Sequence, residues 1–299
     1  MLRLKMNSIF TLDTVDAMLQ QEDAGYKLEV DGPTSGRGSS IFVNAVTREI
    51  MVDWCYSIAD ICKFDSETVE IAISYLDRFL LTEKSSEMGA LVDPRVTQLA
   101  TTTALYTAIK IVESNAMGPE ILPILSQGMY TVQQVECMEL EMLQALKWRL
   151  NPPTAHAFVQ QYLEQPCLSL SLNDAERETV YELSTLQIRL AARDCKFIQV
   201  KRSVLGLSCV MNAVEGLLGL SNATTTIGDK LSQMVDIDWR SLECIEIRNC
   251  LYAAIGTSHQ AGAHDHASGM LLDTRLEKQK CRYDCNIQTL DASPRSTTE

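Results

Sequence analysis

Residues 93–112 read Asp93-Pro-Arg-Val-Thr-Gln-Leu-Ala-Thr-Thr-Thr-Ala-Leu-Tyr-Thr-Ala-Ile-Lys-Ile-Val112, and this stretch decides the fold. Aspartate followed by proline is a strong start signal for a helix, because proline is tolerated at the first helical position. The residues that follow are apolar on nearly every side, which is typical of a helix buried inside a bundle. We therefore expect a central helix with other helices packed around it.

Helical periodicity extends on both sides of this stretch, from about residue 42 to residue 256. Upstream, an apolar stripe that includes Ile50 predicts one helix, and the residues from Asp65 to Leu80 predict a second. Short alternating segments with hairpin turn signals are absent from the sequence. The pattern therefore indicates an all-α protein.

Downstream, we expect a short helix over 120–128 and a longer one that begins with the capping box Thr131-Val-Gln-Gln134 and runs to Trp148. The prolines of Asn151-Pro-Pro153 end this run, because proline cannot continue the hydrogen-bond ladder of a helix. The helical pattern then resumes in stretches at roughly 154–165, 173–196, 202–219, 228–235 and 239–255. This order predicts two successive bundles of about five helices each.

The two bundles are flanked by segments of different composition. The stretch 31–40 is rich in Gly and Ser, and large apolar residues are nearly absent after Leu272. Such segments lack the apolar surface needed for a packed core. We predict four parts, namely a flexible N-terminal arm, a first bundle, a second bundle and a disordered tail, over residues 1–41, 42–152, 153–257 and 258–299.

Composition excludes several classes of protein. The chain has 299 residues and a formal net charge of −13, so it repels nucleic-acid backbones and anionic membranes, and we expect neither as a partner. No apolar run approaches the roughly 18 residues of a membrane span, and the first residues lack a signal-peptide core. The ten cysteines lie mostly singly in helical patterns, as reduced thiols do. We therefore expect a protein or small-molecule partner, in the nucleus and cytoplasm.

Few side chains could converge for catalysis. The chain has four histidines, three of them in the tail, and we expect the fourth, His156, to be a surface residue. The sequence lacks the Glu-x-x-His, His-Glu-x-x-His and Gly-x-Ser-x-Gly patterns of common metal and nucleophile sites. The tail residues His264, His266, Cys281 and Cys285 are zinc-type donors, but the Cys-x₃-Cys spacing is loose and we favour a solvated tail. We predict no metal and no cofactor.

Two charged residues lie beside apolar stripes. Lys110 is the only charge between Leu99 and Val112, and Glu139 lies among apolar residues such as Met138. The lysine stem can pack while its amine reaches water, and the glutamate can belong to a charged helix face. Alternatively, both charges meet polar groups of a partner. We treat each as a lone charge in the free protein.

Several motifs resemble those of a cyclin box. Arg48-Glu-Ile-Met-Val-Asp-Trp54 and Tyr75-Leu-Asp-Arg-Phe-Leu80 resemble its opening, and Ala108-Ile-Lys110 is similar to its Ala-Ser-Lys segment. Met138-Glu-Leu140 and Leu146-Lys-Trp148 resemble its fifth helix, and they are more similar to D-type cyclins than to other cyclins. The positions that define a kinase-activating cyclin box are filled by Arg48, Asp77, Leu99, Lys110 and Glu139.

This resemblance implies two tandem five-helix cyclin folds and a regulatory subunit that is not itself an enzyme. The implied function is to bind and activate a cyclin-dependent Ser/Thr protein kinase in cell-cycle control. In the family, the residues at Lys110 and Glu139 contact the kinase helix that carries a catalytic glutamate, and Ile111 lies beside them. The resemblance also implies a structural ion pair between Arg48 and Asp77 and a packing role for Leu99. A non-activating cyclin-fold scaffold or transcription-factor-like adaptor is the alternative hypothesis.

The sequence departs from the family at several positions. Ile111 stands where an aromatic residue is usual, and Val112 where an acid is common. The substrate-docking patch of the family is matched only at Ile50, Met51, Trp54 and Gln98, while Thr47, Ser57 and Thr97 replace its other residues. We therefore expect weak docking of Arg-x-Leu motifs in protein substrates.

Leu242-Glu-Cys-Ile-Glu246 matches the Leu-x-Cys-x-Glu motif with which D-type cyclins bind retinoblastoma-like proteins. In this chain the motif lies in a predicted helix, with Leu242, Ile245 and Cys250 expected to face the core. We interpret the match as a coincidence.

Overall fold

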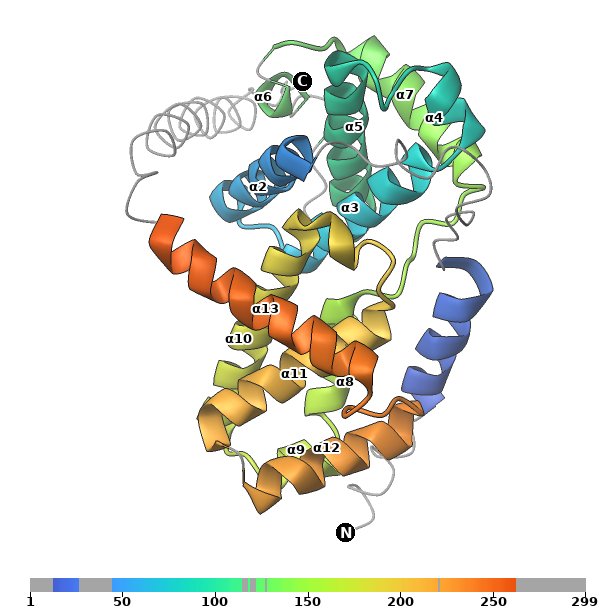
Figure 1. Ribbon diagram of the computed structural model, residues 1–299. Coiled ribbons are helices and arrows are strands. Elements are labelled where there is room, and N and C mark those ends of the chain that lie inside the picture. The colour runs from blue at the N-terminus through green and yellow to red at the C-terminus, as the bar shows by residue number, and fades with distance from the viewer. Residues whose placement is uncertain are drawn as a thin grey trace, which may run out of the picture.

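The computed structural model describes residues 13–26, 45–114, 118, 122–126, 128–219 and 221–261. Within these ranges the regular elements are helices and no strand is present, so the predicted all-α class is confirmed (Figure 1). The helices form two bundles, one above the other in Figure 1, each with its own apolar core.

The first bundle is built around α5 (Pro94–Val112), as the sequence predicts. The Asp93 carboxylate accepts a hydrogen bond from the backbone N–H of Arg95 and so caps the helix. Residues 100–109 of α5 are all buried, and the helix packs between α3 and α7. The other helices of this bundle are α2 (Ala45–Cys62), α3 (Ser66–Leu80), α4 (Glu83–Glu87), α6 (Leu122–Leu125) and α7 (Val132–Ala145).

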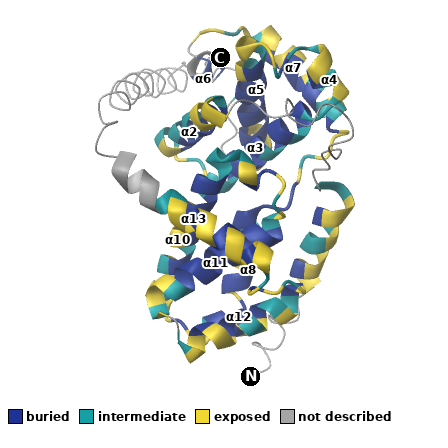
Figure 2. Cartoon of the chain, viewed as in Figure 1, coloured by how far each residue is buried: buried dark blue, intermediate teal, exposed yellow. Residues whose placement is uncertain are grey.

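The second bundle is built around α11 (Arg202–Leu218), whose residues 203–214 are all buried (Figure 2). The surrounding helices are α8 (Ala155–Leu163), α9 (Pro166–Ser169), α10 (Asp174–Arg193), α12 (Asn222–Val235) and α13 (Leu242–Ala261), with the short η3 (Cys195–Phe197). Of these, α8, α10, α12 and α13 all pack against α11. The arrangement repeats that of the first bundle, with one buried helix enclosed by its neighbours.

The start of α12 and the end of α13 show the largest differences from the bounds expected from the sequence. Helix α12 begins at Asn222 instead of about residue 228, because the Ser221 hydroxyl caps it by accepting from the backbone N–H of Thr224. The threonine-rich run at its start has low helix propensity, which hides this cap in the sequence pattern. Helix α13 continues past Gly256 to Ala261 and so includes the first residues of the expected tail.

The expected flexible arm is wrong for residues 13–26. Residues 13–21 form a helix, followed by the π-helical turn η1 (Glu22–Tyr26), and Figure 1 shows this segment in dark blue beside the second bundle. Val15 is fully buried in the second core, and Met18 and Leu19 pack against that core. These side chains lie three and four residues apart, so they form one apolar face of the helix.

Polar contacts join the two bundles. The Arg193 guanidinium of α10 pairs with Glu49 and Asp53 of α2, and Arg189 pairs with Asp60 of α2 at 3.0 Å. These pairs are partly exposed, so each contributes little to stability but helps set the orientation of the bundles. Two buried contacts, described below, cross the same junction.

None of the described helices is long and apolar enough to cross a membrane. In the same part of the chain, no three His, Cys, Asp or Glu side chains come together as metal ligands would. The glycine-rich stretch at 31–40 and the zinc-type donors of the tail lie outside the described residues.

Candidate partner-binding site

Lys110 and Glu139 contact each other. The Lys110 Nζ lies 2.6 Å from Oε1 and 2.8 Å from Oε2 of Glu139, and the Thr107 hydroxyl donates to Oε1 at 3.0 Å. The expectation of two lone charges is therefore wrong. Helices α5 and α7 pack side by side, and the last turn of α5 brings Lys110 over the middle of α7.

This ion pair lies at the boundary between core and solvent. The Glu139 side chain is 11% exposed, whereas that of Lys110 is 44% exposed. The Lys110 amine also lies 5.2 Å from the centre of the Tyr106 ring, a cation–π contact. The lysine thus covers a nearly buried carboxylate while its amine can still donate hydrogen bonds outward.

Large apolar side chains are exposed next to the pair. Ile111 is 47% exposed, Val112 is 41% exposed, and Leu140, which follows Glu139 in α7, is 51% exposed. Exposed apolar side chains around a few oriented polar groups are typical of a surface that a protein partner covers. The site can therefore offer both apolar contact and charged hydrogen-bonding groups.

Arg48 and Asp77 form the ion pair that the sequence predicts. Nη1 and Nη2 of Arg48 lie 2.5 and 3.0 Å from the two oxygens of Asp77, and both residues are buried. Burial opposes the charge of Arg48, but the Asp77 carboxylate more than offsets this and raises the pKa of the guanidinium. Arg48 also donates from Nε to the carbonyl of Ala192 in α10 at 3.0 Å. The pair thus joins α2 to α3, and through Ala192 it also joins the first bundle to the second. The sequence pattern does not reveal the contact with Ala192.

The remaining predicted site residues have mixed exposure. Leu99 is partly buried and packs against the first core, as do buried Met51 and half-buried Trp54, whereas Ile50 is 64% exposed. Gln98 is exposed and accepts a hydrogen bond from the Tyr130 hydroxyl at 3.3 Å. These residues present a small apolar surface at most.

Thr97 explains why the docking patch is incomplete. Its side chain is buried, and its hydroxyl donates to the carbonyls of Ala90 at 2.5 Å and Asp93 at 3.0 Å. Its hydroxyl therefore faces backbone carbonyls of the turn that precedes α5, and the buried side chain supplies no apolar wall to a peptide side chain.

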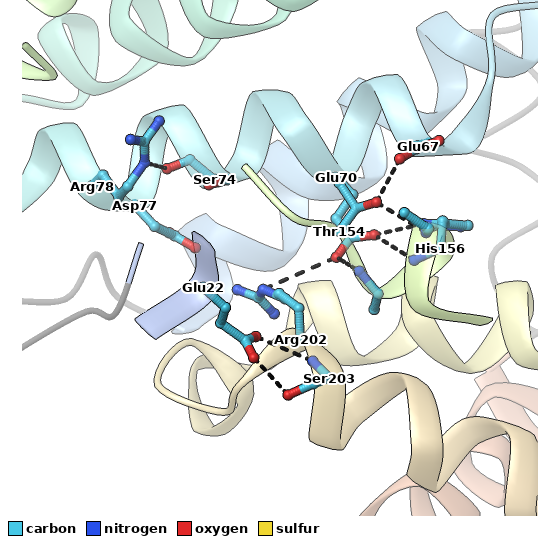
Figure 3. Close-up of polar contacts among 12 residues, drawn as sticks. Glu22, Glu67, Glu70, Ser74, Asp77, Arg78, Thr154, His156, Arg202 and Ser203 are labelled. Carbon is cyan, nitrogen blue, oxygen red and sulfur yellow. Dashed lines mark hydrogen bonds and ion pairs between the residues drawn. The ribbon is translucent and has the colours of Figure 1, made fainter. Parts of the chain in front are cut away.

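His156, expected at the surface, is fully buried instead, and Figure 3 shows its contact with Glu70. Its Nδ1 lies 2.6 Å from Oε2 of Glu70 in α3, and Glu70 also accepts from the backbone N–H groups of Ala155 and His156 at 2.8 and 3.2 Å. The carboxylate from the first bundle thus caps α8, the first helix of the second bundle. The sequence feature that could have indicated this buried contact is Glu70 itself, a glutamate inside the apolar stripe of α3.

The two residues shift each other's pKa. Burial would lower the pKa of His156, but the hydrogen bond and charge of Glu70 outweigh it and raise the pKa above its ordinary value. Burial would raise the pKa of Glu70, but His156, Arg202 and the N–H of Ala155 together lower it. The pair joins α3 to the first turn of α8, so it contributes to the junction between the bundles.

The expected orientation of the Leu-x-Cys-x-Glu segment is wrong. Leu242 is 79% exposed and Ile245 is 40% exposed, whereas Cys244 is buried in the second core. Helix α13 is therefore rotated relative to the expected register, and the central cysteine of the motif is inaccessible.

The chain is similar in sequence to a known protein family and to individual proteins. Residues 16–151 match the family model "Cyclin, N-terminal domain". The chain is 27% identical over 196 residues to G1/S-specific cyclin-D1 of Xenopus laevis. The matched region covers 64% of this chain and 63% of that protein. It is 29% identical over 178 residues to G1/S-specific cyclin-D1 of Mus musculus, covering 58% and 56%. The chain thus spans less than two thirds of these relatives.

Two solved structures share the fold. A viral cyclin from herpesvirus saimiri has a TM-score of 0.60 at 16% identity and covers 81% of this chain and 97% of its own. The CAK complex from Chaetomium thermophilum bound to ATP-gamma-S contains a chain with a TM-score of 0.50 at 11% identity, covering 99% and 92%. Likeness at such low identity concerns the fold alone.

Proposed function

We propose that this chain is a member of the cyclin family, similar to D-type cyclins, and a regulatory subunit that binds and activates a cyclin-dependent Ser/Thr protein kinase. The observation that carries this proposal is the Lys110–Glu139 ion pair at the end of α5, with exposed apolar side chains beside it. A packed monomer gains little from leaving Ile111 and Leu140 in water, whereas a partner helix could cover both.

The pair is preorganised to hold a partner's backbone. Lys110 has three N–H donors, and those not used by Glu139 can donate to carbonyls at the end of a kinase helix. Glu139 is held by Lys110 and Thr107, and its remaining lone pairs can accept from backbone amides. Contacts of this kind would favour the inward position of the kinase helix, in which the kinase's own Lys–Glu pair is complete.

The chain offers a matched control for this proposal. Lys84 and Glu141 form an ion pair of 2.9 Å whose side chains are 39% and 37% exposed, and Glu141 lies on α7 two residues beyond Glu139. We would compare Lys110→Ala and Glu139→Ala with Lys84→Ala and Glu141→Ala for kinase pulldown and for activity of the captured kinase. The proposal is supported if Lys110→Ala and Glu139→Ala lose both kinase capture and kinase activity while Lys84→Ala and Glu141→Ala keep both.

The alternative is a cyclin-fold scaffold or adaptor that does not activate a kinase. It is favoured by Ile111 and Val112, which replace an aromatic and an acidic residue of the family and are exposed. An adaptor predicts that the Lys110 and Glu139 variants leave kinase activity unchanged.

We also propose that the protein resides in the nucleus and cytoplasm. The described cysteines are all free, and those at 55, 167, 209 and 244 are buried. Reduced, packed thiols are typical of these compartments.

A further inference from the structure

A hollow lies where the N-terminal segment meets the junction of the two bundles. Its walls come from Glu22 and Tyr26, from Ser74 and Arg78 of α3, from Pro152 and Pro153 of the linker, and from residues 198–202, which lead into the first residue of α11. Figure 3 shows Glu22 and Arg202 close together beside α3, and Arg78 extending from α3 itself. None of these residues belongs to the proposed kinase-binding site.

Arg78 brings an uncompensated positive charge to the hollow. Its guanidinium lies 4.8 Å from the centre of the Tyr26 ring and 5.7 Å from that of Tyr75. It donates to the carbonyls of Ser74 at 3.3 Å and Arg149 at 2.9 Å, and no carboxylate of the described residues lies within 4.0 Å. Burial lowers the pKa of Arg78, as expected for a cation without a counter-ion. The rest of its five N–H donors lack an acceptor in the same set of residues.

Arg202 is a second arginine at the hollow, and among the described residues its one ion pair, with Glu70, is at the limit of ion-pair distance. Its side chain is only 21% exposed, and no hydrogen bond from its guanidinium is formed within the described structure. The nearest carboxylate oxygen is Oε1 of Glu70, 4.0 Å from Nε, and that oxygen already accepts from the N–H of Ala155. A planar fork of N–H groups therefore lies at the hollow without acceptors of its own.

The acidic side chains around the hollow are engaged elsewhere. Glu22 accepts from the backbone N–H of Ser203 at 3.1 Å and from its hydroxyl at 2.6 Å, so it caps α11. Asp23 pairs with Lys201 at 2.7 Å. Neither carboxylate is within ion-pair distance of Arg78 or Arg202.

We propose that this hollow binds a phosphoryl group, carried by a phosphorylated side chain of a peptide or present as free phosphate. Arg78 and Arg202 both line the hollow, and their unused N–H groups can donate to the oxygens of a phosphate dianion. A polyanion such as a nucleic acid is disfavoured, because the chain as a whole carries a net charge of −13 and repels it. A single phosphoryl group meets Arg78, Lys201 and Arg202 beside one lining carboxylate, that of Glu22, which already accepts hydrogen bonds from Ser203.

The test uses the full-length protein and two probes, inorganic phosphate and a fluorescent phosphoserine peptide with its unphosphorylated counterpart. We expect the phosphoserine peptide to bind and inorganic phosphate to compete with it. At a phosphate concentration ten times its Kd, the melting temperature should rise by about 3–6 °C relative to chloride at equal ionic strength. Arg202→Gln should weaken phosphate binding by about tenfold or more.

Arg95→Gln is the matched control, because Arg95 is exposed and lies at the start of α5, away from the hollow. It should bind as the unmodified protein does. Arg202→Lys preserves the charge without the fork and should bind with intermediate affinity, which keeps the test valid if Arg202→Gln does not fold.

The outcomes separate the sources of the phosphoryl group. Tighter binding of the phosphoserine peptide than of free phosphate identifies a phosphorylated protein as the ligand, and equal binding identifies the free anion. Binding that is absent, or that is the same in Arg202→Gln and Arg95→Gln, overturns the proposal. Because Arg202 lies outside the kinase-binding site, this result is independent of the proposed function.

Discussion

Glu70 of α3 and His156 of α8 form a buried contact of 2.6 Å between Oε2 and Nδ1 that joins the two bundles. Each residue lies on a different side of the junction, and the same carboxylate caps the first helix of the second bundle. The contact makes the relative position of the bundles depend on the charges of two side chains.

Stability should therefore depend on pH through this pair. The folded-state pKa of His156 is raised, so its contribution is complete below its unfolded pKa of about 6.5 and is lost as pH rises through the folded pKa. The folded-state pKa of Glu70 is lowered, so its contribution is present above about pH 4.3 and is lost as pH falls through the folded pKa. We expect the greatest contribution between about pH 4.3 and 6.5.

Urea denaturation of the unmodified protein and of His156→Gln, from about pH 4.3 to well above pH 6.5, measures the effect, because the difference between them cancels other titrating groups. The difference in unfolding free energy should shrink as pH rises above about 6.5 and through the raised folded-state pKa of His156. A difference that stays constant with pH would show that His156 remains neutral in the folded protein.

Removing the carboxylate should destabilise the junction strongly. Glu70→Ala leaves buried His156 and two backbone N–H groups without their acceptor, so we expect a loss of about 3–5 kcal/mol of unfolding free energy. Glu141→Ala removes a partly exposed carboxylate and should cost no more than about 1 kcal/mol. Similar losses in the two variants, measured by chemical denaturation, would contradict the structural role of Glu70.

The N-terminal segment should contribute to stability through Glu22. This side chain is buried and caps α11, whose own cap residue, Lys201, forms no side-chain cap bond. Glu22→Ala should therefore lower the unfolding free energy by about 1–2 kcal/mol, the range found for helix caps. Glu246→Ala, at an exposed position of α13, is the control and should be neutral. An unchanged Tm in Glu22→Ala would mean that the segment does not hold its place in solution.

Substrate docking through the Arg-x-Leu patch should be weak. Burial of a peptide leucine is worth roughly 1.5–3 kcal/mol in a complete pocket, but Thr97 turns its hydroxyl towards the chain and leaves one wall missing. We expect a titrated Arg-x-Leu peptide to bind with a Kd of about 100 µM or weaker. A low-micromolar Kd that is lost in Trp54→Ala would show that the patch is functional.

Local sequence signals predicted the elements that depend on them. Asp93 and Pro94 specify the start of α5, and the capping box at Thr131 and Gln134 specifies the start of α7. The pairing of Arg48 with Asp77 was implied by the cyclin-box resemblance and is present. The two helix starts depend on residues that are neighbours in the sequence, and the ion pair follows a family motif.

Contacts between helices could not be predicted in the same way. The pairing of Lys110 with Glu139 depends on how α5 and α7 are rotated about their axes, and the burial of His156 depends on how the bundles meet. The prediction that Leu242 faces the core was wrong, because α13 has no clear apolar face from which its orientation could be predicted. A hydrophobic stripe indicates which side of a helix is buried, but it does not identify the partner of a charged side chain at the edge of that stripe.

The central claim is that Glu139 and Lys110 hold a kinase helix. The most direct test is the Kd of a cyclin-dependent kinase for Glu139→Ala, with Glu141→Ala on the same helix as control, together with the melting temperature of each variant. Removing a buried charged acceptor should cost about 2–4 kcal/mol of binding, roughly a 30- to 1000-fold loss of affinity. We expect this loss in Glu139→Ala, with a fall of only a few degrees in Tm, and unchanged binding in Glu141→Ala. Equal kinase affinity in both variants, or loss of binding that only accompanies unfolding, would contradict the account.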